Sequence, residues 1–121
     1  MNIQECYQQL GGDFAQVEKR LSSEALVRRF LAKFLDDGSF SELCIAMEDG
    51  DSHKAFRAAH TLKGVSGNLS LDRLFSSAAQ LADVLRPEGA AIPAGAHARF
   101  EEVKQDYQLT VRAISAYLVS E

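Results

Sequence analysis

The chain has 121 residues, of which 46% are hydrophobic, and a formal net charge of −4. This length suits one domain with one core, and the hydrophobic fraction is too high for a disordered chain. The acidic balance argues against a dedicated nucleic-acid-binding protein, which normally carries a basic excess. The N-terminus lacks the segments of a signal peptide, and no run of residues suits a membrane span. We therefore expect a soluble, cytoplasmic protein forming a single domain over residues 1–121.

Apolar residues recur with a helical period along most of the chain, starting with one or two short helices within residues 3–20. In the next segment Leu26, Phe30 and Phe34 recur every four residues and predict a core-facing stripe. Both prolines fall within residues 86–95, which predicts a loop. With no strand-like alternation, the chain is predicted to be an all-α antiparallel helical bundle. The longer helices are predicted over 22–37, 39–48, 51–69, 70–85 and 95–119.

The central segment 51–69 is predicted to turn a histidine toward solvent. Asp51 suits the N-cap of this helix, and successive residues advance by about 100°. The side opposite His60 then collects small and apolar residues, which form the core face: Ala55, Ala58, Leu62, Val65, Ser66 and Leu69. His60 therefore points to water, near the middle of the outward face.

The neighbours of His60 on that face suit a reactive imidazole. Gly64 lies one turn later and leaves the ring open, while Lys63 lies beside it and can reach an anion held there. Gly67 lies on the same side. Phe56, one turn earlier, is poorly placed for the core, so it either contacts a partner or folds back against a neighbouring helix. Glycine inside a helix costs about 1 kcal/mol relative to alanine, so these glycines call for an explanation.

A purely structural interpretation competes with this one. Gly67 and Asn68 could simply end the helix, because glycine and asparagine are favoured there, and Ser70 could cap the next helix. This interpretation accounts for Gly67 but not for Gly64, because the core-facing period continues beyond it. Arg57, also on the outward face, suits a solvated charge as well as a partner contact.

The segment HTLKGVSGNL, residues 60–69, resembles the signature of histidine-containing phosphotransfer (HPt) domains, roughly H-x-L-K-G-x-S/A-x-N followed by an apolar residue and glycine. The Gly-Gly-Asp of 11–13, the Gly-Asp of 50–51 and the Arg-Leu of 73–74 are similar to the hybrid-kinase-type layout. Ser70 departs from the pattern, since the family often has glycine at that position.

The resemblance implies an antiparallel up-down four-helix bundle with one or two accessory N-terminal helices. The first long bundle helix would lie within residues 22–48, broken near Asp37–Gly38. His60 would accept the phosphoryl group, Lys63 would stabilise its charge, and Gly64 would leave access. Phe56, Arg57 and Gly67 would then be partner-binding residues.

The implied function is that of a phosphorelay intermediate in two-component signalling. His60 would exchange a phosphoryl group with the aspartates of response-regulator receiver domains, supplied by a hybrid sensor histidine kinase. The chain shows no nucleotide-binding or metal-binding motif, so Mg²⁺ is expected from the receiver partner. The protein is therefore expected to be a phosphocarrier rather than an enzyme, with no cofactor of its own. We expect a monomer, and relatives suggest Gln80 as a polar group assisting the histidine.

Other functions remain open at this point. An HPt-like adaptor would bind partner proteins without carrying phosphate. A metal site of His53, His60 and His97 is disfavoured, because the first two lie seven residues apart rather than three or four. Cys6 and Cys44 lack metal-site spacing and are expected to be reduced core thiols. Met1, together with a helix reaching the last residues, favours a freestanding domain.

Overall fold

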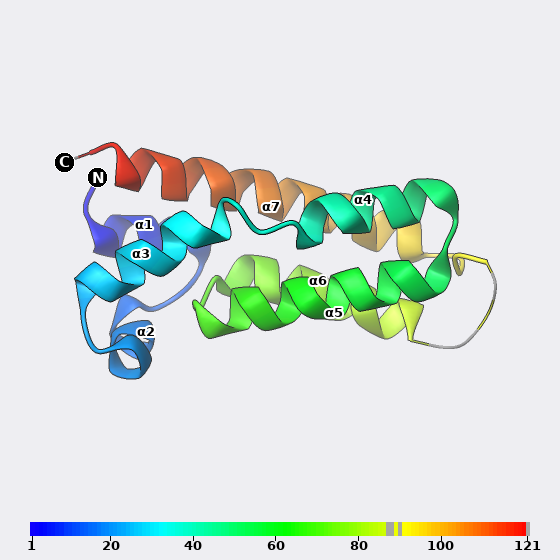
Figure 1. Ribbon diagram of the computed structural model, residues 1–121, viewed down its shortest axis with the longest axis horizontal. Helices are drawn as coiled ribbons and strands as arrows, with labels where there is room; N and C mark the ends of the chain where they lie inside the picture. The colour runs from blue at the N-terminus through cyan, green and yellow to red at the C-terminus, as the bar shows by residue number, and fades with distance from the viewer. Residues whose placement is uncertain (87–88, 90, 121) are drawn as a thin grey trace.

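The computed structural model describes residues 1–86, 89 and 91–120, and all regular structure within these ranges is helical (Figure 1). The two short helices predicted within residues 3–20 are present as α1 and α2, and the predicted longer helices follow in order. The helices are α1 Ile3–Leu10, α2 Phe14–Leu21, α3 Glu24–Phe34, α4 Ser39–Asp49, α5 Ser52–Asn68, α6 Asp72–Leu85 and α7 Ala96–Leu118.

Helices α4 to α7 form the predicted up-down bundle, in which each helix runs antiparallel to the one before it (Figure 1). Helix α5 packs against both α4 and α6, and α6 packs against α7. The first bundle helix is broken, as predicted: α3 ends at Phe34, and α4 begins at Ser39. Helices α1 and α3 pack against the far half of α7, which runs the length of the molecule (Figure 1).

Side-chain caps fix where several of these helices start. Asn2 accepts a hydrogen bond from the backbone N–H of Glu5, and the Glu5 carboxylate accepts one from the N–H of Asn2, which completes a capping box. Asp51 caps α5, as predicted, by accepting from the N–H of Lys54 at 3.0 Å. The start of α5 is therefore set by its first residues.

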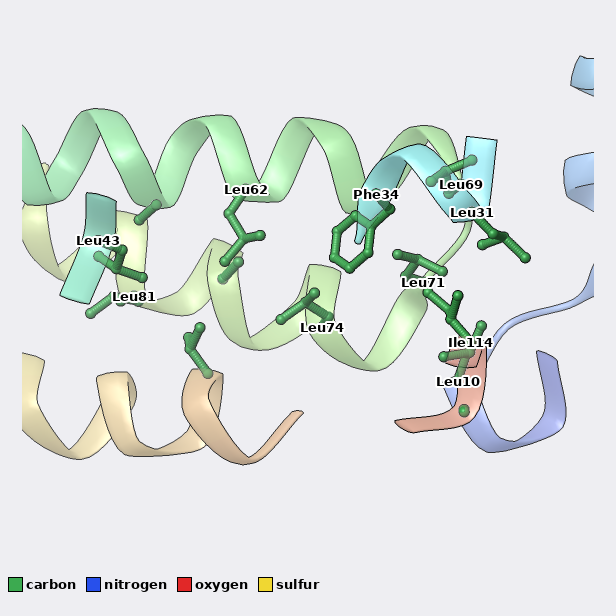
Figure 2. Packing of buried hydrophobic residues seen from close by; sticks show 14 of the residues in the cluster. Leu10, Leu31, Phe34, Leu43, Leu62, Leu69, Leu71, Leu74, Leu81 and Ile114 are labelled. Atoms are coloured by element: carbon green, nitrogen blue, oxygen red, sulfur yellow. The ribbon is translucent and has the colours of Figure 1, made fainter. Parts of the chain in front are cut away.

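One hydrophobic core runs through the bundle and into its N-terminal end (Figure 2). Figure 2 shows Leu43, Leu62, Leu74 and Leu81 meeting between the bundle helices, and each is fully buried. At the other end, the hydroxyl of buried Tyr7 donates to the carbonyl oxygen of Leu69 at 2.8 Å. This bond ties α1 to the end of α5.

The predicted apolar stripe of residues 22–37 is wrong in its phase. Val27, Leu31 and Phe34 are buried, whereas Phe30 is 37% exposed and Leu26 is only half-buried. The buried residues follow the spacing i, i+4, i+7, so the core face of α3 is centred about one residue away from the predicted stripe. Phe30 is therefore left on the surface beside Lys33, whose Nζ lies 5.6 Å from its ring centroid.

The turn between α5 and α6 also differs from the prediction. Ser70 does not cap α6: it is buried with a φ of +54°, and the N-cap residue is Leu71. The left-handed region costs a non-glycine residue about 1–2 kcal/mol, which explains why glycine suits this position. Gly12 approaches the same turn so closely that a Cβ atom there would lie 2.1 Å from the carbonyl oxygen of Ser70.

Three residues of the predicted loop over 86–95, Pro87, Glu88 and Ala90, lie outside the described residues. Cys6 is buried, as predicted, whereas Cys44 is only half-buried. Among the described residues, none of the helices combines the length and the apolar character needed to cross a bilayer.

Candidate functional site

His60 lies in the middle of α5, on the face turned away from the core, and its side chain is exposed. Most of the predicted core-facing residues are buried, and only Val65 is half-buried: Ala55, Ala58, Leu62, Ser66 and Leu69 form the buried set. Ser66 donates its hydroxyl to the carbonyl oxygen of Leu62 at 2.7 Å, so its polar group is satisfied within the helix. The outward position of the imidazole therefore follows from the burial of the opposite face.

A hollow of about 460 Å³ brings His60 together with three of the predicted site residues, Lys63, Gly64 and Gly67. Lys63 is half-buried on this side of the helix. The hollow is bounded by α5, by α2 and by the start of α6. Its remaining lining residues are Gln16, Arg20, Asn68, Ser70, Asp72 and Phe75.

The two glycines of this hollow have different roles. A Cβ atom added at Gly64 would meet no atom within 4 Å, so the absent side chain leaves open space one turn after His60. A Cβ atom at Gly67 would lie 3.0 Å from two carbons of the Phe75 ring. Gly67 thus lies on the side of His60, as predicted, and its missing side chain also allows close approach of an α6 aromatic ring.

Phe56 lies against the imidazole. Its ring centroid is 5.8 Å from that of His60, and the ring planes differ by 19°. The ring is half-buried and packs against the edge of the core. Arg86, at the end of α6, places its guanidinium carbon 5.7 Å from the Phe56 centroid. The Phe56 ring thus contacts both the imidazole of His60 and the guanidinium of Arg86.

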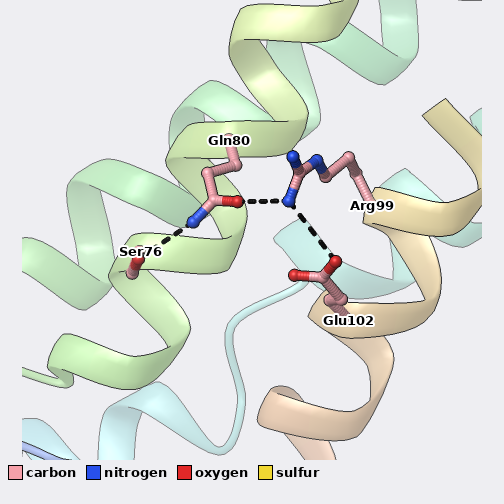
Figure 3. Close-up of polar contacts among 4 residues, drawn as sticks. All are labelled: Ser76, Gln80, Arg99 and Glu102. Atoms are coloured by element: carbon pink, nitrogen blue, oxygen red, sulfur yellow. Dashed lines mark hydrogen bonds and ion pairs between the residues drawn. The ribbon is translucent and has the colours of Figure 1, made fainter. Parts of the chain in front are cut away.

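Two other residues considered from the sequence lie elsewhere. Arg57 lines a separate hollow between α4 and α5, together with Glu42, Asp49 and Thr61. Gln80 faces α7, where Arg99 donates to its side-chain oxygen, while its amide nitrogen donates to Ser76 at 3.2 Å (Figure 3). The structure therefore does not bring Gln80 to His60, because its side chain lines a hollow that His60 does not line.

Arg20 is one of the site residues that sequence reasoning missed. One nitrogen of its guanidinium lies 2.6 Å from Oγ of Ser70, 3.0 Å from the carbonyl oxygen of Asn68 and 3.3 Å from that of Gly67. It reaches the hollow from α2, 40 residues before His60 in the chain. Its local sequence offered only a basic last turn of a short helix, a pattern that does not reveal which distant element it contacts.

Within the described parts of the chain, no three His, Cys, Asp or Glu side chains are grouped so that they could hold a metal ion. The three histidines weighed as a metal site from the sequence therefore do not form one: His53, His60 and His97.

Comparison with known proteins agrees with the geometry of this site. The family model of the Hpt domain matches residues 4–113, which include α5 and all the residues that line the hollow. No match was found among curated proteins or among solved structures. Because the match spans most of the 121 residues, the chain belongs to the Hpt domain family.

Proposed function

We propose that the protein is a phosphorelay intermediate that carries a phosphoryl group on His60 between receiver-domain aspartates. Hpt domains act in histidine phosphotransfer as phosphocarriers, together with receiver domains and kinases. The observation that carries the assignment to His60 is its exposure beside Lys63 and above an open hollow at Gly64. In this proposal Lys63 stabilises the phosphoryl charge and Gly64 leaves room for the partner.

The transfer needs little chemistry from the carrier. Nε2 of a neutral imidazole attacks the phosphorus of an aspartyl phosphate, so an N–P bond forms while the P–O bond to the carboxyl group breaks. The bonding pair leaves with the aspartate carboxylate, and the proton on Nδ1 stays on the ring. The ring then carries a positive charge next to the phosphoryl dianion, whose remaining charge Lys63 offsets. Catalysis is therefore mainly positioning and charge stabilisation.

Mg²⁺ belongs to the partner in this proposal. A receiver domain must hold the metal with carboxylates around its phosphorylated aspartate, because Mg²⁺ prefers oxygen ligands. The face that meets His60 is therefore acidic. The carrier itself needs neither metal nor nucleotide and acts as a monomer of one domain.

The surface beside the hollow suits an acidic partner. Residues 14–34, which contain α2 and α3, carry five cations against two carboxylates, a net charge of +3 in a chain of net −4. An apolar groove of about 340 Å³ continues from the hollow through the shared residues Arg20 and Asn68. Exposed Phe30 and Lys33 line it. This charge complementarity would raise the rate of encounter with a receiver domain.

The test is phosphotransfer from a receiver domain phosphorylated in the presence of Mg²⁺. The wild-type chain should take up acid-labile, base-stable phosphate, and His60→Gln should abolish the labelling. His53→Gln is the matched control, because His53 is also exposed on α5 and lies two turns earlier. Full labelling of the His60→Gln protein would exclude this histidine as the acceptor. Binding of receivers without any labelling would instead favour the adaptor function.

A further inference from the structure

The two sides of the His60 ring along the helix axis are unequal. Toward the start of α5, Phe56 covers the ring with a centroid separation of 5.8 Å and nearly parallel planes. Toward the end of α5, Gly64 leaves the space empty. Residues four apart on a helix are neighbours, and offset stacking of rings is favourable at this separation. The imidazole is therefore supported from one side only.

Arg86 fixes the position of Phe56 from a different helix. It is the residue after the last turn of α6, and its guanidinium carbon lies 5.7 Å from the Phe56 ring centroid, which is within the range of a cation–π contact. The same guanidinium lies 3.3 Å from the carboxylate of Asp83, an exposed residue one turn earlier on α6. Phe56 is thus held between the α6 terminus and His60 rather than free to turn into solvent.

We propose that Phe56 is a positioning residue for phosphotransfer, and that Arg86 braces it. The stacked phenyl ring limits the rotamers of an otherwise exposed histidine, so that Nε2 is held in one orientation when a partner arrives. This inference rests on the proposed function of His60. It assigns Phe56 a role inside the site, in place of the partner contact expected from its outward position in the sequence.

The first experiment measures the ring itself, without any partner. In Phe56→Leu, the His60 ring-proton resonances should move toward those of exposed His53, because the ring current of a stacked phenyl is lost. Phe56→Tyr should keep the wild-type resonances. Unchanged His60 resonances in Phe56→Leu would overturn the stack.

The second experiment measures the rate constant of phosphotransfer at saturating receiver, where affinity no longer limits the rate. We expect Phe56→Leu to be slower by roughly tenfold, since a misplacement of 1 Å can cost about a hundredfold. Arg86→Gln should be slower by about threefold, and Phe56→Tyr should match the wild type. Wild-type transfer by Phe56→Leu would overturn the positioning role while leaving His60 as the acceptor.

A matched control is available on α7. Phe100 is also half-buried at the edge of the core, and Nζ of Lys104 lies 5.5 Å from its ring centroid. Phe100→Leu removes a comparable ring but should leave both the His60 resonances and the transfer rate unchanged. An equal loss of rate in Phe100→Leu would show a general packing effect and would overturn the specific role of Phe56.

A small donor separates this inference from the proposed function. Phosphoramidate can phosphorylate an imidazole directly, because its P–N bond breaks with release of ammonia as the new N–P bond forms. If no receiver labels the wild type, the relay function fails. Slower labelling by phosphoramidate in Phe56→Leu than in Phe100→Leu would still support positioning, whereas equal rates would overturn it.

Discussion

Arg20 donates a 2.6 Å hydrogen bond to Oγ of Ser70, so a side chain of α2 holds the left-handed residue between α5 and α6. The same nitrogen also lies within hydrogen-bond distance of two of the last carbonyl oxygens of α5, those of Gly67 and Asn68. The last carbonyls of a helix carry partial negative charge, and that of Gly67 also accepts from the backbone N–H of Ser70 at 3.1 Å. Arg20 therefore caps α5 from outside the bundle.

Arg20→Gln should lower the free energy of unfolding by about 1–2 kcal/mol, because a charged hydrogen-bond donor to several acceptors is lost. Arg20→Lys should recover part of the loss, since it keeps the charge but not the planar group. Urea denaturation measures both. Lys19→Gln, at the neighbouring exposed position, should stay within about 0.5 kcal/mol of the wild type. Equal stability of Arg20→Gln and Lys19→Gln would contradict the capping role.

The φ of +54° at Ser70 makes a second prediction. Ser70→Gly and Ser70→Ala both lose the bond from Arg20, so the difference between them isolates the backbone conformation. The glycine variant should be more stable by about 1 kcal/mol, because glycine adopts left-handed φ without strain. The measurement is again urea denaturation. A more stable alanine variant would show that this turn is not left-handed in solution.

Gly64 should show opposite effects on stability and function. Gly64→Ala should raise the free energy of unfolding by about 1 kcal/mol, because alanine is the better helix former and its Cβ meets no atom within 4 Å. The same methyl group occupies the space beside His60, so the rate of phosphotransfer should fall. Thermal or urea unfolding and the transfer assay check the two parts separately.

Gly67→Ala serves as the comparison for Gly64→Ala. Its new Cβ would lie 3.0 Å from the Phe75 ring, which must shift, so the gain in stability should be smaller than for Gly64→Ala. In a Phe75→Ala background the difference between the two glycine substitutions should disappear. If the difference persists there, the contact with Phe75 is not its cause.

Because the thiol of Cys6 is buried, we expect the protein to lose stability at alkaline pH. Burial raises the pKa of its thiol from 9.0 to about 11. The unfolded chain therefore gives up this proton first, so stability is intact below pH 9 and falls as the pH rises toward 11. Cys6→Ala should be less stable throughout but should lose less between these two pH values. A decline equally steep in both proteins would rule out this thiol as a source.

Much of the fold follows from the sequence because the stripes of α5 and α6 repeat cleanly and Asp51 fixes the start of α5. Phe30 and Ser70 could not be placed in the same way. The first lies on a helix whose burial depends on contacts with α7, and the second adopts a backbone conformation that serine rarely takes.

The site residues on α5 could be predicted from the sequence, whereas those contributed by other helices could not. The outward positions of His60, Lys63 and Gly64 follow from helical geometry alone. Arg20 and Phe75 enter the hollow from α2 and α6, so their places depend on how helices pack. Arg57 lies on the outward side of α5 but lines the hollow toward α4, and the sequence does not reveal which neighbouring helix such a side chain meets.

Helix α7 spans 23 residues, about 34 Å in length, and packs against helices in both halves of the molecule. Its start packs beside α6, and its end holds α1 and α3 through contacts such as that of Cys6 Sγ with the carbonyl oxygen of Ala113. The middle of α7 is held by contacts at both of its ends, so it opens only when both sets of contacts are lost. Amide protons there should therefore be among the slowest to exchange with solvent deuterium, at the cost of global unfolding.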